Sequence, residues 1–169
     1  MSTYLVLTII ADDKPGIVEK LSATIADHGG NWLESRMAQM AGKFAGILRV
    51  SIDEDKTNSL VSALASLGTK GIQVKVEDPG AIAAKAGTQL QLSVVGNDRP
   101  GIVREVSRVL ATLGVNVLEL TTSCEPAEMS AVPLFRSEAL LSVPAGMDTD
   151  DISDALEALS DDLMVEIEH

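Results

Sequence analysis

The sequence is poor in aromatic residues and in cysteine, and each shortage narrows the class of protein it can encode. Aromatic residues make up 2% of the 169 residues, so aliphatic side chains must fill the core. Few rings are left to stack on nucleic-acid bases. The single cysteine, Cys124, has no partner for a disulfide within the chain. This fits a reducing compartment, and we expect a cytoplasmic protein.

Long apolar runs and targeting signals are also missing. No apolar segment approaches the roughly 20 residues that a membrane helix needs. The segment that follows Met1 has neither the basic region nor the small-residue cleavage site of a signal peptide. We therefore expect no membrane segment and no secretion.

Positive charge is scarce, above all in the second half of the chain. The formal net charge is −12, and residues 85–169 carry five Lys or Arg against fifteen Asp or Glu. Residues 148–168 contain nine acidic residues and no basic one. Such a surface repels a phosphate backbone. The sequence therefore predicts that the protein does not bind nucleic acid directly.

Residue patterns for catalysis or metal binding are absent from the sequence. His28 lies beside two glycines and His169 is the last residue, so no two Cys or His residues have the spacing of metal ligands. Cys124 has no nearby histidine to activate it, and no glycine-rich phosphate loop is present. The acidic residues from Asp148 to Asp162 lack the spacing of a calcium loop and are typical of a solvated helix face. We predict no catalytic residue, no metal and no cofactor.

What the sequence does contain is an internal repeat. Asp13-Lys14-Pro15-Gly16-Ile17-Val18 recurs 85 residues later as Asp98-Arg99-Pro100-Gly101-Ile102-Val103. Further on the offset grows to 91, which indicates an insertion of about six residues within Cys124–Pro133 of the second copy. A collinear series of matches indicates a duplication. The matched residues outside the first segment include Gly29 with Gly114, Asn31 with Asn116, Phe44 with Phe135 and Val74 with Val165.

Each copy predicts the order strand, helix, strand, strand, helix, strand. This order is typical of an α+β, ferredoxin-like module, in which an antiparallel sheet carries both helices on one face. We place the first domain at residues 1–78, a linker at 79–87 and the second domain at 88–169, because Pro and Gly interrupt the periodicity between them. The uncovered sheet face or an edge is expected to meet the other copy or another chain, and we expect a homo-oligomer. The predicted strands are Tyr4–Ile10, Asn31–Gln39, Phe44–Ile52 and Gln73–Glu77, then Thr88–Val95, Asn116–Ser123, Leu134–Val143 and Met164–Glu168.

Apolar stripes define the first helix of each copy, and glycines mark its end. The stripes are Ile17, Val18, Leu21 and Ile25 in the first copy, and Ile102, Val103, Val106, Leu110 and Leu113 in the second. Gly29-Gly30 and Gly114 are expected to end these helices in the left-handed conformation. The second helices begin near Thr57 and Thr149, and the tight turn Ala41-Gly42 joins the two middle strands of the first copy.

The two Asp-x-Pro-Gly segments lie where a strand turns into a helix. A structural explanation is that Asp caps the helix, Pro occupies its first turn and Gly permits close packing. A functional explanation is that the free N–H groups and the positive dipole end bind the carboxylate of an amino acid. The candidate ligand-binding residues are Asp12, Asp13, Lys14, Pro15, Gly16, Ile17 and Asn31 in the first copy, and Asn97, Asp98, Arg99, Pro100, Gly101, Ile102 and Asn116 in the second.

A strand, then Asp-x-Pro-Gly-Ile-Val, then an amphipathic helix ending in Gly-x-Asn resembles the ACT domain, and the chain shows this pattern twice. That resemblance implies modules that bind amino acids at domain interfaces and regulate enzymes or transcription. The segments Pro126-Ala127-Glu128-Met129-Ser130 and Pro133-Leu134-Phe135-Arg136-Ser137-Glu138 resemble the two-ACT proteins of the glycine cleavage system transcriptional repressor family. Ala131 stands where that pattern would have glycine.

The resemblance implies a protein that lacks a DNA-binding domain and acts on a DNA-bound transcriptional activator, with glycine or serine as the signal. An amino-acid-responsive regulator of this kind is our leading hypothesis. The alternative is a regulatory or assembly subunit of an enzyme of amino-acid metabolism. A fragment of an enzyme is the third hypothesis, since ACT modules also precede catalytic domains such as formyltetrahydrofolate deformylase. We rank it last, because the sequence ends at the close of the second module and leaves no room for a catalytic domain.

Overall fold

A computed structural model describes residues 1–79, 87–126 and 132–169. The chain divides into two compact units, Met1–Ala83 and Ala84–His169, and each is described by itself. Most of the predicted linker 79–87 and the centre of the predicted insertion lie outside the described residues. The linker boundaries remain a prediction.

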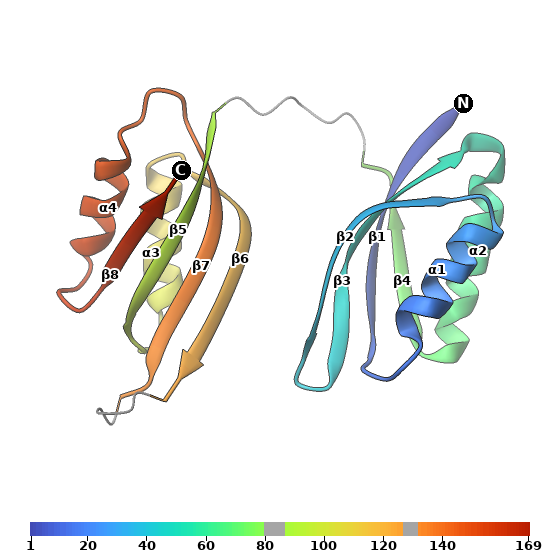
Figure 1. Ribbon diagram of the computed structural model, residues 1–169, viewed down its shortest axis with the longest axis horizontal. Coiled ribbons are helices and arrows are strands. Elements are labelled where there is room, and N and C mark those ends of the chain that lie inside the picture. Colours follow the sequence, from blue (N-terminus) through green and yellow to red (C-terminus); the bar gives the residue numbers. More distant parts are fainter. Residues whose placement is uncertain (80–86, 127–131) are drawn as a thin grey trace. The chain divides into compact units, whose positions relative to one another are not determined.

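The first unit is a four-stranded antiparallel sheet with two helices on one face (Figure 1). The strand order is β2-β3-β1-β4, so the first and last strands of the unit pair with each other. This confirms the ferredoxin-like prediction for the first copy. The elements are β1 (Ser2–Asp12), α1 (Ile17–Asp27), β2 (Asn31–Met40), β3 (Lys43–Asp53), α2 (Thr57–Ser66) and β4 (Ile72–Glu77), with short 3-10 turns at Glu54–Lys56 and Leu67–Lys70.

The second unit has the same topology, with strand order β6-β7-β5-β8. The predicted strands are confirmed in every case, although several extend one or two residues further at an end than expected. The elements are β5 (Thr88–Asn97), α3 (Ile102–Thr112), β6 (Asn116–Glu125), β7 (Leu134–Val143), α4 (Thr149–Glu157) and β8 (Met164–Glu168).

Strand register confirms the duplication and locates the insertion. A bulge interrupts the pairing between Trp32 and Glu34 in β2, and another does so between Val117 and Glu119 in β6, at equivalent positions. Two residues join β2 to β3, whereas eight join β6 to β7. The six additional residues therefore lie in the β6–β7 connection, where the change of offset predicted them.

The core of each unit lies between the sheet and its helices. In the first unit Leu5, Leu7 and Ile9 alternate along β1 toward the helices and are buried, and α1 buries Ile17, Leu21 and Ile25. The equivalent residues form the core of the second unit. One part of the predicted helix stripe is wrong: Val18 and Val103 are 47% and 43% exposed. Each follows a buried isoleucine by one residue, and a helical step of about 100° places it at the margin of the buried face.

Both first helices end as predicted, on a left-handed glycine. Gly29 and Gly114 have φ of +81° and +75°, which L-residues rarely adopt. The N–H of Gly30 donates to the carbonyl of Ile25 at 2.8 Å, and the N–H of Gly29 donates to that of Ala26 at 3.1 Å. The second unit repeats both bonds, which together form a Schellman motif. Gly30 itself is not left-handed.

The turn between β2 and β3 places a non-glycine residue in the left-handed region. Ala41 and Gly42 have φ of +50° and +82°, the pattern of a two-residue type I′ turn, which favours Asn-Gly. Replacing Ala41 with asparagine is expected to raise the free energy of unfolding by about 1 kcal/mol, because alanine resists this conformation. Urea unfolding measures the change. Gly42→Ala is the matched control and should lower stability; a destabilised A41N variant would contradict the assignment of this turn.

Candidate functional site

The Asp-x-Pro-Gly turns are anchored on the neighbouring hairpin in the same way in both units. The N–H of Asp13 donates to the carbonyl of Gly42 at 2.9 Å, and the N–H of Asp98 donates to that of Pro133 at 2.8 Å. Gly42 and Pro133 are equivalent positions at the end of the two β-strand connections. The backbone therefore holds each turn in place before any side chain contributes.

The capping scheme expected from the sequence is wrong in three respects. Gly16 and Gly101, not the aspartates, occupy the N-cap positions, and neither helix start has a side-chain cap. The prolines therefore precede the helix and do not lie in its first turn. The two glycines have φ of +96° and +86°, and a Cβ on either would meet nothing within 4 Å. Glycine is thus required by the left-handed backbone, and not by close packing.

The turns leave amide groups available at both helix N-termini. In α1 the first helical bond runs from the N–H of Lys20 to the carbonyl of Gly16 at 3.0 Å, and in α3 from Glu105 to Gly101 at 3.0 Å. The amides of the residues between have no such partner within the helix, although the N–H of Ile102 in the second unit donates to the carbonyl of Arg99 at 3.3 Å. Such a group of N–H donors at a positive dipole end suits a carboxylate.

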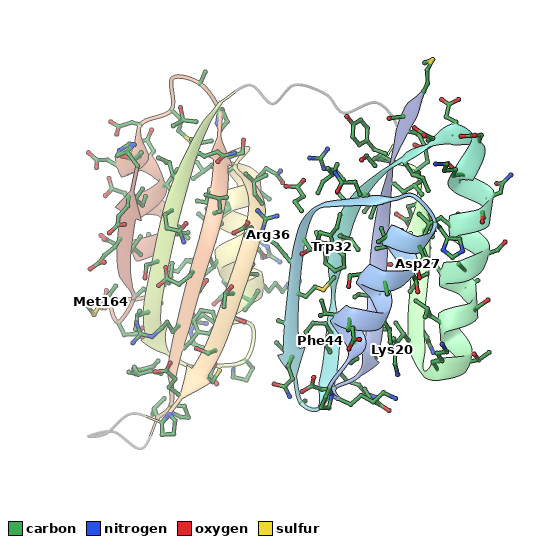
Figure 2. The ribbon with its side chains drawn as sticks, turned by 45° about the vertical axis from the view of Figure 1, so that its right-hand side comes forward. Lys20, Asp27, Trp32, Arg36, Phe44 and Met164 are labelled. Atoms are coloured by element: carbon green, nitrogen blue, oxygen red, sulfur yellow. The ribbon has the colours of Figure 1, made fainter. Side chains whose placement is uncertain are left out.

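In the first unit the turn borders an open groove and carries free cations. The groove is lined by turn and helix residues, among them Asp13, Lys14 and Gly16, and by Phe44 of β3. Lys14 and Lys20 make no ion pair within the described part of the chain. Lys20 stands exposed on α1 (Figure 2). An anion in this groove would meet the positive end of the helix dipole and the charge of Lys14, and also the carboxylates of Asp13 and Glu19 that line it.

Asp12, the last residue of β1, belongs to a pair on the other side of this turn. Its carboxylate accepts a hydrogen bond from Lys43. That bond and the Lys43 charge, aided by Lys14, lower the pKa of Asp12 below its ordinary value. Because Lys43 already neutralises Asp12, the carboxylates left to line the groove are Asp13 and Glu19.

The second turn is more buried than the first, and its cationic side chain is already paired. The guanidinium of Arg99 pairs with Glu105 of α3, whose Oε2 atom is buried and has this charge as its only partner within the described residues. The equivalent residues in the first unit, Lys14 and Lys20, are both positive. Burial and the nearby Asp98 carboxylate raise the pKa of the Cys124 thiol, which disfavours the reactive thiolate.

Asp162 ties the segment before β8 to the end of β5. Its Oδ2 atom accepts the backbone N–H of Asn97 at 2.7 Å, and its other oxygen accepts the hydroxyl of Ser160. These two hydrogen bonds, the Ser160 bond first, lower the pKa of Asp162. The carboxylate therefore also anchors the residue that precedes the second turn.

The depressed pKa of Asp162 predicts a pH dependence of stability. A carboxyl group whose pKa is lower in the folded state stabilises fully above its unfolded pKa of about 3.9. That contribution is lost as the pH falls through the lower, folded value. Asp162→Asn is therefore expected to be less stable than wild type at pH 7. The difference between the two free energies of unfolding, measured with urea, should narrow toward pH 3. Asp161→Asn, which removes a neighbouring charge without a hydrogen bond in the described structure, should keep the wild-type pH profile; an unchanged gap for D162N would contradict the role of this carboxylate.

The structure brings most of the predicted site residues together, but not the asparagines. In each unit the residues from the strand end to the first helical residue form one turn, Asp12 to Ile17 and Asn97 to Ile102. Asn31 and Asn116 begin β2 and β6, at the far end of an 11-residue helix that spans about 16 Å. No single unit therefore places its asparagine at its own turn. The ligand-binding role of all these residues remains a prediction.

Sequence reasoning missed the polar groups that support the second turn and an apolar cavity beside it. Glu105 and Asp162 act through contacts that join separate elements. The cavity lies between α3 and the sheet of the second unit and is described below. A size comparison of equivalent residues in the two copies would have indicated it.

The residues that the structure describes contain no cluster of three or more His, Cys, Asp or Glu side chains placed to hold a metal ion. None of their helices has the length and apolar character to cross a bilayer.

Known proteins are similar to this chain along nearly its whole length. The ACT domain model matches residues 3–77 and 88–168. The glycine cleavage system transcriptional repressor of Escherichia coli (strain K12) is 25% identical over 171 aligned positions, which cover 95% of this chain and 85% of that protein. That relative is, by its name, a regulator of transcription.

Solved structures extend the likeness to the fold. The crystal structure of an unknown protein from Galdieria sulphuraria has a TM-score of 0.85 at 28% identity and covers 99% of this chain and 98% of its own. A candidate glycine cleavage system transcriptional repressor has a TM-score of 0.69 at 18% identity and covers 99% and 97%. The chain therefore belongs to the ACT domain family, with two ACT modules in tandem, and is similar as a whole to the glycine cleavage system transcriptional repressor.

Proposed function

We propose that the protein is an amino-acid-responsive regulator in the cytoplasm, which binds a small amino acid at the first Asp-x-Pro-Gly turn and acts through contact with another protein. The observation that carries this proposal is the groove at the start of α1. There, unpaired amide groups, the left-handed Gly16 and the free charge of Lys14 converge. Similarity to a transcriptional repressor built from the same two modules supports the regulatory role.

The groove matches the two charged ends of an amino acid. Its carboxylate would accept hydrogen bonds from the first amides of α1 and pair with Lys14, while its ammonium would face Asp13. The groove is open, and a Cβ added to Gly16 would meet nothing within 4 Å, so no wall encloses a ligand side chain there. Glycine and serine are therefore the ligands we propose. In the second unit Glu105 already neutralises the equivalent cation, so the two turns should not bind equally.

Protein contact, and not DNA contact, is the proposed route of regulation. The net charge of −12 disfavours a phosphate backbone. A DNA-bound activator is the partner we propose, with self-association into an oligomer, and ligand binding would shift the population of the partner-binding state. The chain alone should not retard operator-sized DNA in a mobility-shift assay at physiological salt; retardation would contradict this route.

A second candidate is a regulatory or assembly subunit of an enzyme of amino-acid metabolism. The ACT architecture supports it equally well, because the same module serves both roles in the resemblance described above. Affinity capture with the purified chain distinguishes the two: recovery of a transcriptional regulator favours the first, and recovery of a metabolic enzyme favours the second. We propose no catalytic activity for the chain, and turnover of a substrate by the purified protein would contradict that.

Thermal denaturation in the presence of single amino acids tests ligand binding. A ligand at 100 times its Kd stabilises the folded state by about 2.7 kcal/mol. For a unit of this size this is a rise of roughly 10 °C or more in Tm. We expect glycine or serine to raise Tm selectively at millimolar concentration. The ligand part of the proposal fails if no amino acid shifts the transition.

Matched substitutions then locate the site. Lys14→Gln is expected to weaken binding about tenfold, because it removes one charged hydrogen bond to the carboxylate. Arg99→Gln, at the equivalent position of the second unit, should leave the affinity unchanged. The reverse pattern would move the site to the second turn, and an unchanged affinity in both variants would place it away from the turns.

A further inference from the structure

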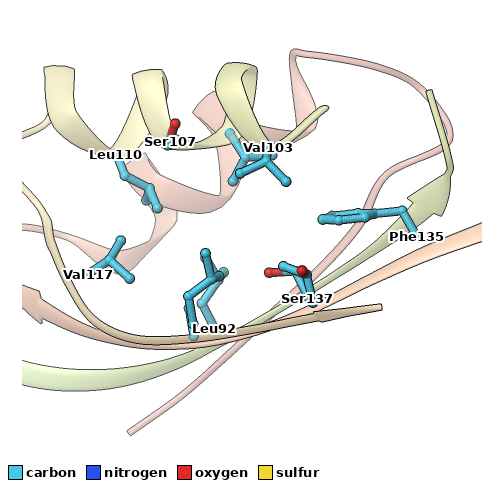
Figure 3. A pocket seen from close by; sticks show the side chains of 11 residues that line it. Leu92, Val103, Ser107, Leu110, Val117, Phe135 and Ser137 are labelled. Atoms are coloured by element: carbon cyan, nitrogen blue, oxygen red, sulfur yellow. The ribbon is translucent and has the colours of Figure 1, made fainter. Parts of the chain in front are cut away.

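The second unit contains a small apolar cavity between α3 and the sheet, which encloses about 30 Å³ and opens to solvent at its mouth (Figure 3). Eight of its eleven lining residues are apolar, and the other three carry hydroxyl groups. No charged side chain lines it. Its inner wall is made by Leu92, Leu110 and Ala139, which are 1–3% exposed.

At three strand positions that line this cavity the first unit carries a larger side chain, and at two others, equivalent to Leu120 and Ser137, it carries the smaller Ser35 and Gly46. Strand register makes Trp32 the equivalent of Val117, Met37 that of Thr122, and Leu48 that of Ala139. Trp32 and Met37 pack against the core of the first unit, and Leu48 is part of it. Trp32 and Phe44 lie beside α1 (Figure 2). Three separate positions therefore carry smaller residues in the second unit, and all three border the cavity.

An unfilled cavity of this kind destabilises a fold. Loss of core side-chain volume costs about 24 cal/mol per Å³ of cavity that remains. The first unit shows that the same topology accommodates residues that avoid this loss. Smaller side chains at three positions on two strands thus leave a defined space. A bound molecule would recover the van der Waals contacts that are lost there.

Ser137 gives the cavity one specific polar group. It is 4% exposed, and its side chain has no hydrogen-bond partner within the described structure. Its hydroxyl points into the cavity (Figure 3). A buried hydroxyl without a partner costs free energy, which a ligand with a matching group would restore. The first unit has Gly46 at this position and no hydroxyl.

We propose that this cavity is a second ligand site, which takes a small uncharged molecule with a branched aliphatic group and one hydrogen-bonding group for Ser137. The enclosed space is small, so the branched end of the ligand would enter it and the rest would lie in the open mouth. A charge is excluded because no lining residue would compensate its burial. This site differs in chemistry from the carboxylate groove of the first unit and does not depend on it.

Methyl NMR of the full chain with 3-methyl-1-butanol as the probe tests this site. We expect saturable shifts of the methyl groups of Val106, Leu110 and Val117, with a Kd on the order of 1 mM. The equivalent side chains of the first unit, Leu21 and Ile25, should not shift. Absence of saturable binding, or equal shifts in both units, would overturn the proposal.

Variants that copy the first unit provide the control. Ala139→Leu and Thr122→Met should each weaken the probe at least tenfold by filling the cavity. Thr122 is exposed at the rim, so T122M keeps the test decisive should A139L not fold. Ser137→Ala should weaken 3-methyl-1-butanol several-fold but leave the hydrocarbon 2-methylbutane unaffected. Wild-type affinity in T122M, or equal losses for both probes in S137A, would contradict the assigned cavity or the assigned hydroxyl respectively.

Discussion

Replacement of Gly46 with alanine is expected to lower the stability of the first unit by about 2–3 kcal/mol, because β2 passes too close to β3 for a side chain at this position. An added Cβ would lie 2.2 Å from the carbonyl oxygen of Arg36 and 2.6 Å from Cγ of Met37. The first of these atoms belongs to the backbone and cannot rotate away. Either the strand pair separates or Met37 leaves its place against the core.

Fluorescence of Trp32 during urea unfolding measures this loss, because it is the only tryptophan in the chain and lies in the first unit. Gly68→Ala is the matched control: a Cβ there meets nothing within 4 Å and φ is not positive. That variant should be neutral or slightly more stable. Equal stability of G46A and G68A would show that the two strands can separate without cost.

The fold followed from the sequence because its signals are local. Alternation along β1 and β5, the apolar stripes of α1 and α3, and the glycines at φ > 0 each act within a few residues. The repeat then made each copy a check on the other. Even the insertion was located by the offset alone, and strand register confirms it.

The helix starts were predicted incorrectly because two local preferences compete there. Aspartate is a favoured N-cap, but Asp13 and Asp98 lie three residues before the N-cap positions, where hydrogen bonds from their backbone N–H groups to hairpin carbonyls hold them. The chain then needs a left-handed residue to enter the helix, and Gly16 and Gly101 provide it. A sequence pattern shows the residue types but not which hydrogen bond prevails.

The cavity of the second unit was beyond prediction for a different reason. It depends on the summed volume of side chains from α3, β5, β6 and β7. Val117 and Ala139 both read as ordinary core residues in their own strands. Only the structure shows that both side chains face the same helix, α3, and that together they are too small to fill the space beside it. The equivalent residues of the first unit, Trp32 and Leu48, are larger, so the two copies differ in side-chain size at these positions.

The same comparison predicts that Leu48→Ala lowers the stability of the first unit by about 2–5 kcal/mol. Leu48 is 2% exposed and belongs to the core between α1 and the sheet. Its removal leaves a hollow, because Trp32 is held in the adjacent strand and cannot fill the space without leaving its own contacts. Urea unfolding followed by Trp32 fluorescence gives the value. The residue at the equivalent position of the second unit is already alanine.

Ile47→Ala is the control, since Ile47 precedes Leu48 in β3, points to the opposite face of the sheet and is 50% exposed. It should cost less than about 1 kcal/mol, because an exposed side chain loses little burial. A loss below 1 kcal/mol for L48A would mean that the first unit collapses around a missing side chain. The smaller residues of the second unit would then leave no persistent space, and the proposal that the cavity binds a ligand would lose its support. A full loss in L48A, with probe binding confined to the second unit of wild type, would instead show that this topology keeps such a cavity open.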